Sequence, residues 1–206
     1  MAASTAAQSI IVNAGVSVPV NALIIDNHNL AGKALQLRAS TDNFVTSDVL
    51  IVGWTQADNS NILKRFTLVN YQYWKLVILS GSPAASIGEI YLGVRVQLPK
   101  NPAIPFDPES ETDFSRQGFT PFGYLYQRED YRRDYFDLNF PPLTLGQDQI
   151  FINWWQECTC LKPFYFCFKP ETEPEDVILV RNESQFSAIM SNSVRIGRRM
   201  LLREVF

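Results

Sequence analysis

Hydrophobic and polar residues alternate along most of the first hundred residues, the pattern of β-strands with one buried face. The alternation is clear at 16–20 and again at 35–39. It is longest at Ile90–Leu98, where five apolar positions alternate with Tyr, Gly, Arg and Gln. Segment 71–79 is apolar on both faces, which predicts a central strand.

The connections between these strands are short and rich in turn-forming residues. Thr41–Asn43, 57–61 and 80–83 consist mainly of Asp, Asn, Ser, Gly and Pro. Short strands at this spacing are typical of an antiparallel β-sandwich. The strand that runs through Ile24 and Ile25 into the polar corner Asp26–Asn29 suggests a jelly-roll sandwich, closed by a partner strand at 87–93.

A change in composition after Leu98 predicts a domain boundary. Residues 101–114 contain three prolines and four acidic residues, which favours a stiff, extended linker. We therefore expect a mainly β protein with two domains. The predicted domains are an N-terminal sandwich at 1–100 and a second small β domain with one short α-helix at 115–206.

The second half combines strands with one predicted helix. Thr144–Gln147 has the form of a capping box, which predicts that a helix begins there. Apolar residues then recur at helical spacing: Ile150, Phe151, Trp154, Trp155 and Cys158. Phe164–Phe168 and Leu201–Phe206 are predicted strands, and the charge-balanced aromatic segment 124–140 is predicted to be a solvated or inter-subunit strand.

Charge disfavours two classes of partner. The net charge is −3 and the pI is near 5.2, so neither nucleic acid nor anionic lipid is attracted overall. Residues 1–100 carry seven Lys/Arg and five Asp/Glu, and residues 101–206 carry eleven and sixteen, so the halves are +2 and −5. Unlike halves of neighbouring copies would attract. No run of 18 apolar residues and no basic leader is present, so we expect neither membrane insertion nor export.

Catalytic chemistry has few candidates in this sequence. His28 is the only histidine, and no serine lies in a Gly-x-Ser-x-Gly motif. We therefore interpret Asp26–Asn29 as a hydrogen-bonded turn. Cys158, Cys160 and Cys167 form an odd set without the paired spacing of zinc sites, which favours reduced thiols. We predict no catalytic residues, no metal site and no cofactor.

Two sets of residues are candidates for binding. Aromatic and amide side chains in the loops of a sandwich can bind sugars, and the available groups are Asp42, Asn43, Trp54 and Asn59. Near the C-terminus a basic cluster could lie at a solvated face or meet acidic segments of a neighbouring copy at a subunit interface. Its members are Arg195, Arg198, Arg199 and Arg203.

Three segments of the first half carry a resemblance to a known family. They resemble the galactose-binding-like jelly-roll of tail-tip proteins of tailed bacteriophages, and they are Asn21–Leu30, Tyr73–Leu76 and Ile87–Gly93. The second half, with Trp154 and Trp155 on its helix, resembles the small β domain that builds rings in phage tail tubes and distal tail proteins. The order of the two domains is the reverse of that usual in distal tail proteins.

The resemblance implies a non-enzymatic virion protein, a distal tail or minor tail subunit assembled in the host cytoplasm. The partners that the resemblance implies are further copies in a sixfold ring, together with tail-tube and baseplate hub proteins. The alternative is a carbohydrate-binding module that contacts the host surface. An enzyme acting through His28 is a third hypothesis.

Overall fold

The computed structural model describes residues 7–79, 84–103, 111–113, 116–119, 121–122, 124–128, 132–158, 162–183, 187–192 and 195–205. The chain divides into two compact units. The first comprises Met1–Arg95 with Lys169–Val177, and the second Val96–Phe168 with Ile178–Phe206. The predicted linker 101–114 lies largely outside the described residues, and the segment 169–177 packs with the first unit although it follows most of the second in sequence.

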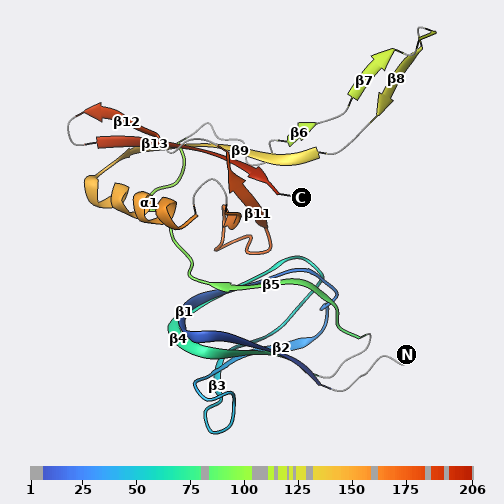
Figure 1. Ribbon diagram of the computed structural model, residues 1–206, viewed down its shortest axis with the longest axis vertical. Helices are drawn as coiled ribbons and strands as arrows, with labels where there is room; N and C mark the ends of the chain where they lie inside the picture. The colour runs from blue at the N-terminus through green and yellow to red at the C-terminus, as the bar shows by residue number, and fades with distance from the viewer. Residues whose placement is uncertain are drawn as a thin grey trace. The chain divides into compact units, whose positions relative to one another are not determined.

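The first unit is one antiparallel sheet folded over on itself (Figure 1). The strand order is β3-β2-β4-β1-β5. The strands are β1 (Gln8–His28), β2 (Ala34–Ser40), β3 (Val49–Thr55), β4 (Ile62–Ile78) and β5 (Ile87–Gly93).

Two long strands form both layers of this unit. The N-terminal half of β1 pairs with the C-terminal half of β4, and the C-terminal half of β1 pairs with the N-terminal half of β4. The register breaks between Asn13 and Val18, where Gly15 has a φ of 79° and its N–H donates to the Asn13 side chain. Only glycine adopts that φ freely, so the bend between layers is encoded here.

The core lies between the layers. Leu23 and Ile25 of β1 face Leu35 and Leu37 of β2, all with almost no exposed surface. Trp74 of β4 is buried among them, and its indole N–H donates to the Tyr71 carbonyl at 3.2 Å. The predicted central strand at 71–79 is therefore confirmed as the C-terminal half of β4.

The strand predicted at Ile90–Leu98 is only partly confirmed, because β5 ends at Gly93. Gly93 pairs with Ala22, and the register of β1 is interrupted just beyond that pair. There the N–H of Arg95 donates to the Asn21 side chain at 2.5 Å instead of to a strand. The alternation beyond Gly93 therefore lies in an extended, exposed segment.

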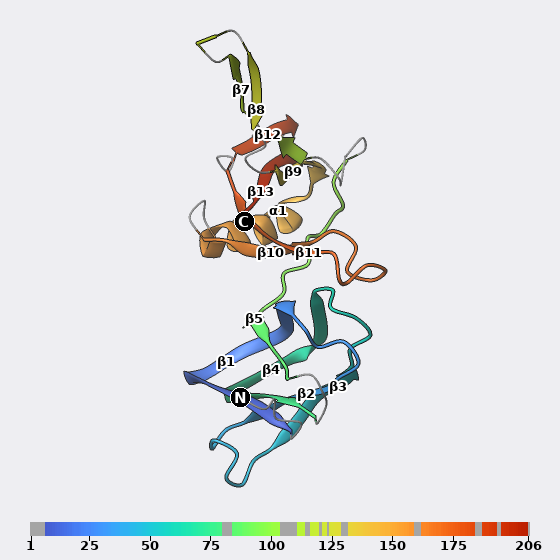
Figure 2. The same cartoon turned by 90° about the vertical axis from the view of Figure 1, so that its right-hand side faces the viewer.

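The second unit contains a six-stranded sheet, a helix and a separate hairpin (Figure 2). The path through the sheet is β10-β11-β13-β9-β6, and β12 also pairs with β13. The elements are β6 (Glu111–Asp113), β7 (Arg116–Phe119), β8 (Leu125–Arg128), β9 (Arg132–Leu143), α1 (Leu145–Cys158), β10 (Phe164–Cys167), β11 (Val177–Asn182), β12 (Ser187–Asn192) and β13 (Arg195–Glu204).

The prediction of a mainly β protein with one short helix is confirmed for the described residues. The capping box is also confirmed: Thr144 N–H donates to Gln147 Oε1 at 3.1 Å, and Gln147 N–H donates to Thr144 Oγ1 at 3.4 Å. Segment 124–140 differs from the prediction, because Phe136, Leu138 and Phe140 of β9 are buried. Charged residues alternate with these buried residues along β9. The overall balance of charged and aromatic residues in the segment did not reveal this alternation.

A buried ion pair joins the helix to the sheet of the second unit. Arg198 of β13 and Asp148 of α1 are 7% and 3% exposed. The guanidinium donates two hydrogen bonds to the carboxylate, at 2.6 and 2.8 Å. Beside this pair, Phe151 packs edge-on against Phe140 with ring centroids 4.8 Å apart.

We predict that Arg198→Met destabilises the second unit by about 3–5 kcal/mol, because it leaves the Asp148 carboxylate buried without its partner. Chemical denaturation followed by tryptophan fluorescence measures the change. Arg199→Met is the matched control, since Arg199 makes the same bidentate contact with Asp137 on the exposed side of the same strand. Its loss should lower the free energy of unfolding much less, because an ion pair exposed to water contributes little to stability. Equal effects of the two variants would contradict the prediction.

Candidate functional site

Asp42, one of the four predicted saccharide residues, organises the loop between β2 and β3. Its carboxylate accepts hydrogen bonds from the backbone of Thr46 at 2.8 Å, the Thr46 hydroxyl, the Ser47 backbone and the Ser40 hydroxyl. The hydrogen bonds from Thr46 and then Ser40 hold the pKa of Asp42 well below its usual range. Asn43 follows with a φ of 57°. Asp42 therefore serves to hold the turn together.

Trp54 and Asn59 lie at the opposite end of β3. β3 runs from one end of the sandwich to the other and has seven residues, so the two ends are about 20 Å apart. Asn59 accepts a hydrogen bond from the Ala31 backbone at 3.0 Å, and the Lys64 ammonium lies over the Trp54 ring, 5.5 Å from its centre. Burial lowers the pKa of Lys64. The four predicted residues are thus not brought together at one place.

The corner Asp26–Asn29 makes the predicted hydrogen bonds to the backbone, but Asp26–His28 form the end of β1 and not a turn. His28 Nε2 is 2.8 Å from the Ser60 carbonyl, and His28 Nδ1 accepts the Leu30 N–H at 3.2 Å. Asn29 bonds to the backbone of Ala84 and Ser86 through its amide group. Both ring nitrogens of His28 are therefore engaged with the backbone.

The expected partner of this corner is confirmed as β5. Asp26 pairs with Glu89 and His28 pairs with Ile87. Asn27 has a φ of 50°, and a Cβ at Gly88 would lie 2.9 Å from the Asn27 Cβ. Glycine at position 88 lets the two strands approach closely.

The segment Lys169–Val177 forms an open groove on the outer face of β4, with a volume of about 520 Å³. The Arg65 guanidinium forms a bidentate pair with Glu171, including a contact of 2.8 Å from Nη2 to Oε2, and the Asn61 amide donates to the Val177 carbonyl at 3.0 Å. The groove is lined by Leu63, Arg65, Phe66, Thr67, Arg95, Pro170, Glu171 and Pro174.

The sequence alone did not predict this groove. The ion pair between Arg65 and Glu171 joins residues 106 positions apart in the sequence, so no local pattern predicts it. The Arg65 hydrogen bond lowers the pKa of Glu171.

The four predicted interface arginines occupy different environments. Arg195 lies in β13, but its side chain is outside the described part of the structure. Arg198 is buried against Asp148, so it is not part of an exposed basic face. Arg199 is paired with Asp137, and Arg203 with Glu183 at 3.1 Å. These contacts lie within the chain because acidic side chains of β9 and of the residue after β11 face β13.

The hairpin β7–β8 carries the largest exposed apolar side chains of the second unit. It forms a two-stranded sheet of its own and projects away from the larger sheet (Figures 1 and 2). Phe119, Phe122, Tyr124 and Leu125 are 63–88% exposed. In the sequence, Pro121 between aromatic residues indicates an exposed turn. The many charged residues of segment 124–140 drew attention away from it.

Two absences hold for the part of the chain that the structure describes. It contains no group of three or more His, Cys, Asp or Glu side chains that could hold a metal ion. It also contains no helix with the length and apolarity to cross a membrane. Cys158 is a free thiol, and Cys160 lies outside the described residues.

Comparison with known proteins gives similar solved structures but no family. No protein-family model and no curated protein matches the chain. The Clostridium perfringens module CpGH89CBM32-5, solved with GalNAc-β-1,3-galactose, is 21% identical with a TM-score of 0.38, and the match covers 43% of this chain and 66% of that one. Chitosan-binding module 1 of a chitosanase/glucanase from Paenibacillus sp. IK-5 is 23% identical over 42% of this chain and 67% of that one, with a TM-score of 0.37.

A pectin-binding carbohydrate-binding module is 16% identical, with a TM-score of 0.37 over 47% of this chain and 73% of that one. None of these three structures is a phage tail protein. At such low identities and TM-scores, the likeness assigns no function to this chain.

The hydrogen bonds to Asp42 predict a pH dependence of stability. A depressed pKa in the folded state stabilises the fold above the ordinary value of 3.8, and this contribution is lost as the pH falls below it. In Asp42→Asn, we expect the unfolding free energy to be lower than in the wild type at neutral pH and the difference to shrink below pH 3.8. Urea unfolding across this pH range measures the difference. A gap that stays constant with pH would contradict this assignment.

Proposed function

We propose that this protein is a structural subunit that assembles with copies of itself through the hairpin β7–β8. The observation that carries the proposal is the exposure of four large apolar side chains on this hairpin, Phe119, Phe122, Tyr124 and Leu125. Soluble proteins seldom leave such a patch uncovered unless it binds another molecule.

The construction of the hairpin supports a protein partner. A two-stranded sheet without further packing has marginal stability in water. β7 and β8 pair only with each other among the described strands. Aromatic residues are also enriched at the centres of protein interfaces. A neighbouring subunit would stabilise the hairpin while burying its aromatic tip.

A ring at the tail tip of a tailed bacteriophage is the assembly that we propose. A hairpin that binds a different surface on the next copy makes a head-to-tail contact, which closes into a ring when the rotation allows. The opposite net charges of the two halves favour such a contact. The resemblance of the sequence to distal and minor tail proteins supports this location, between the tail tube and the baseplate.

We predict that the double variant Phe119→Ser/Phe122→Ser loses self-assembly while keeping its fold, because both side chains are exposed in the single chain. Analytical ultracentrifugation and negative-stain microscopy of the full chain measure assembly, and circular dichroism measures folding.

Val45→Ser is the control, since Val45 is equally exposed but lies in the loop after β2 of the first unit. It should assemble as the wild type does. Rings formed equally well by the double variant would refute the role of the hairpin, and a wild-type protein without rings would refute the ring.

A second candidate function is saccharide binding by the first unit, favoured by the groove beside Arg95. This groove is open, and it combines arginine, carboxylate and hydroxyl groups with the apolar surfaces of prolines and Leu63. Guanidinium and carboxylate groups can hydrogen-bond sugar hydroxyls, and Arg95 is exposed at its edge.

If this candidate is right, the full chain binds a saccharide on a glycan array and Arg95→Ala loses that binding. Arg181→Ala serves as the control, because Arg181 is an exposed arginine of β11 outside the groove. Loss in Trp54→Ala but not in Arg95→Ala would move the site to the end of the sandwich. No saturable binding to any saccharide would exclude this function.

A further inference from the structure

The N-terminal half of β1, residues Gln8–Asn13, is an open sheet edge. On one side it pairs with β4, from Gln8 opposite Ile78 to Asn13 opposite Tyr73. β5 pairs with β1 only from Ala22 to His28. Among the described strands, none lies against the other side of Gln8–Asn13, so backbone donors and acceptors along it face outward.

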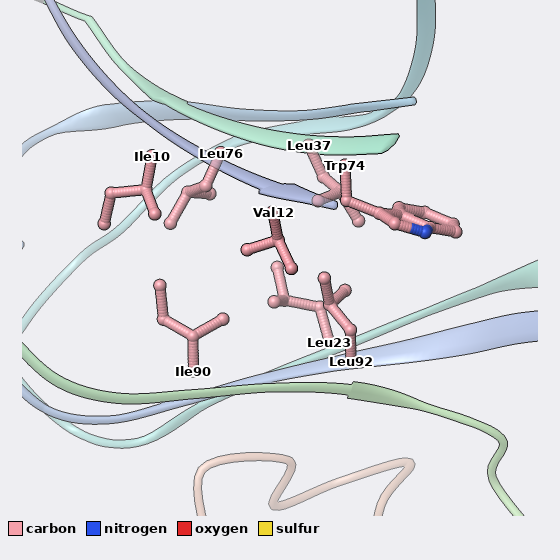
Figure 3. A pocket seen from close by; sticks show the side chains of 8 residues that line it. All are labelled: Ile10, Val12, Leu23, Leu37, Trp74, Leu76, Ile90 and Leu92. Carbon is pink, nitrogen blue, oxygen red and sulfur yellow. The ribbon is translucent and has the colours of Figure 1, made fainter. Parts of the chain in front are cut away.

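The side chains of this edge are apolar and exposed on both faces. Ile10 and Val12 point into a narrow crevice between the layers, toward Ile90 and Leu92 of the opposite layer (Figure 3). Ile11 points to the outer face. The three side chains remain 40–53% exposed although the crevice is lined only by apolar residues. Adding one strand beside β1 would cover them.

The edge also lacks the features that keep edge strands apart. Charges, prolines and bulges are the usual protections. The first Asp, Glu, Lys or Arg of the chain is Asp26, and the register is regular from Gln8 to Asn13. β3, at the other edge, follows the charged cluster of Asp48 with Arg38 and Lys75 and has a register shift beside Arg38. Gln8–Asn13 therefore carries none of the obstacles found at β3.

We infer that the edge of β1 pairs antiparallel with the same edge of a second copy, around a two-fold axis at Ile11. A two-fold axis perpendicular to the sheet places the same face of both copies on the same side. Each residue therefore lies opposite a residue whose side chain is on that same face. Ile11 then faces Ile11 of the second copy, Ile10 faces Val12, and Ser9 faces Asn13. The pattern is self-complementary: β-branched pairs cover the crevice, and polar side chains meet on the outer face.

Two physical terms favour this contact. β-branched residues fit the pleated surface of a sheet, where side chains on opposed strands pack against each other. No like charges face each other across the axis, because this segment carries none. The contact uses residues separate from the hairpin, so it is additional to the proposed ring contact and does not depend on it.

Cysteine crosslinking of the full chain tests the contact and its register. Directly opposed residues have Cα atoms about 4.5–5.5 Å apart, within the range of about 4.4–6.8 Å that a disulfide spans. Ile11→Cys alone should therefore form a disulfide-linked dimer. Leu68→Cys is the matched control, an exposed leucine of β4 away from the edge, and it should stay uncrosslinked, as should the wild type with its native cysteines.

The register makes a second distinction. Ile10→Cys and Val12→Cys should crosslink when mixed, whereas each alone holds its thiols on diagonal positions about 7–8 Å apart. A dimer formed by Ile10→Cys alone as readily as by the mixture would overturn the proposed pairing. So would the absence of a dimer for Ile11→Cys.

A charge at the axis tests the contact without a covalent bond. Ile11→Lys places two ammonium groups opposite each other, so the two-fold dimer should disappear in sedimentation velocity, while Leu68→Lys should keep it. Retention of the dimer in Ile11→Lys would refute the inference. Crosslinking through Ile11→Cys is also measured in the Phe119→Ser/Phe122→Ser background, where it should persist even though rings are lost, which separates this contact from the hairpin.

Discussion

The pairing of β1 with β4 is the constraint on which the first unit depends. Both strands run through both layers, so one ladder, with register shifts at the bend, aligns the two faces of the core. The bend at Gly15 turns this ladder over, and Leu23, Leu37 and Trp74 then meet between the layers. Because the ladder is shared, a shift of register in one layer would move core residues outward in the other.

The two units are stabilised by different interactions. The first relies on packing between its layers, and its buried polar groups are satisfied mainly by the backbone, as at His28. The second holds a helix against one side of its sheet with a buried ion pair and a cluster of aromatic rings around Phe151. Such a pair fixes the position of the helix more than it adds stability, because burying two charges is itself costly.

Local pattern predicted much of the fold. Alternation located β2 and the buried half of β4, the capping box located the start of α1, and the corner at His28 was correctly paired with β5. Features set by distant contacts were missed. β5 stops at Gly93, where the register of β1 is interrupted next to Ala22. The groove forms because Glu171 meets Arg65, and Arg198 is buried because Asp148 faces it. The four sugar-binding candidates share a composition but lie at opposite ends of β3, which composition does not reveal.

The inclusion of Lys169–Val177 in the first unit has a consequence for synthesis of the protein. Pro170 and Pro174 of this segment line the groove together with Leu63 of β4. A ribosome releases residues in order, so the sandwich strands emerge long before the segment that completes their outer face. The first unit must therefore wait, with part of its apolar surface in water, until most of the second unit has been translated.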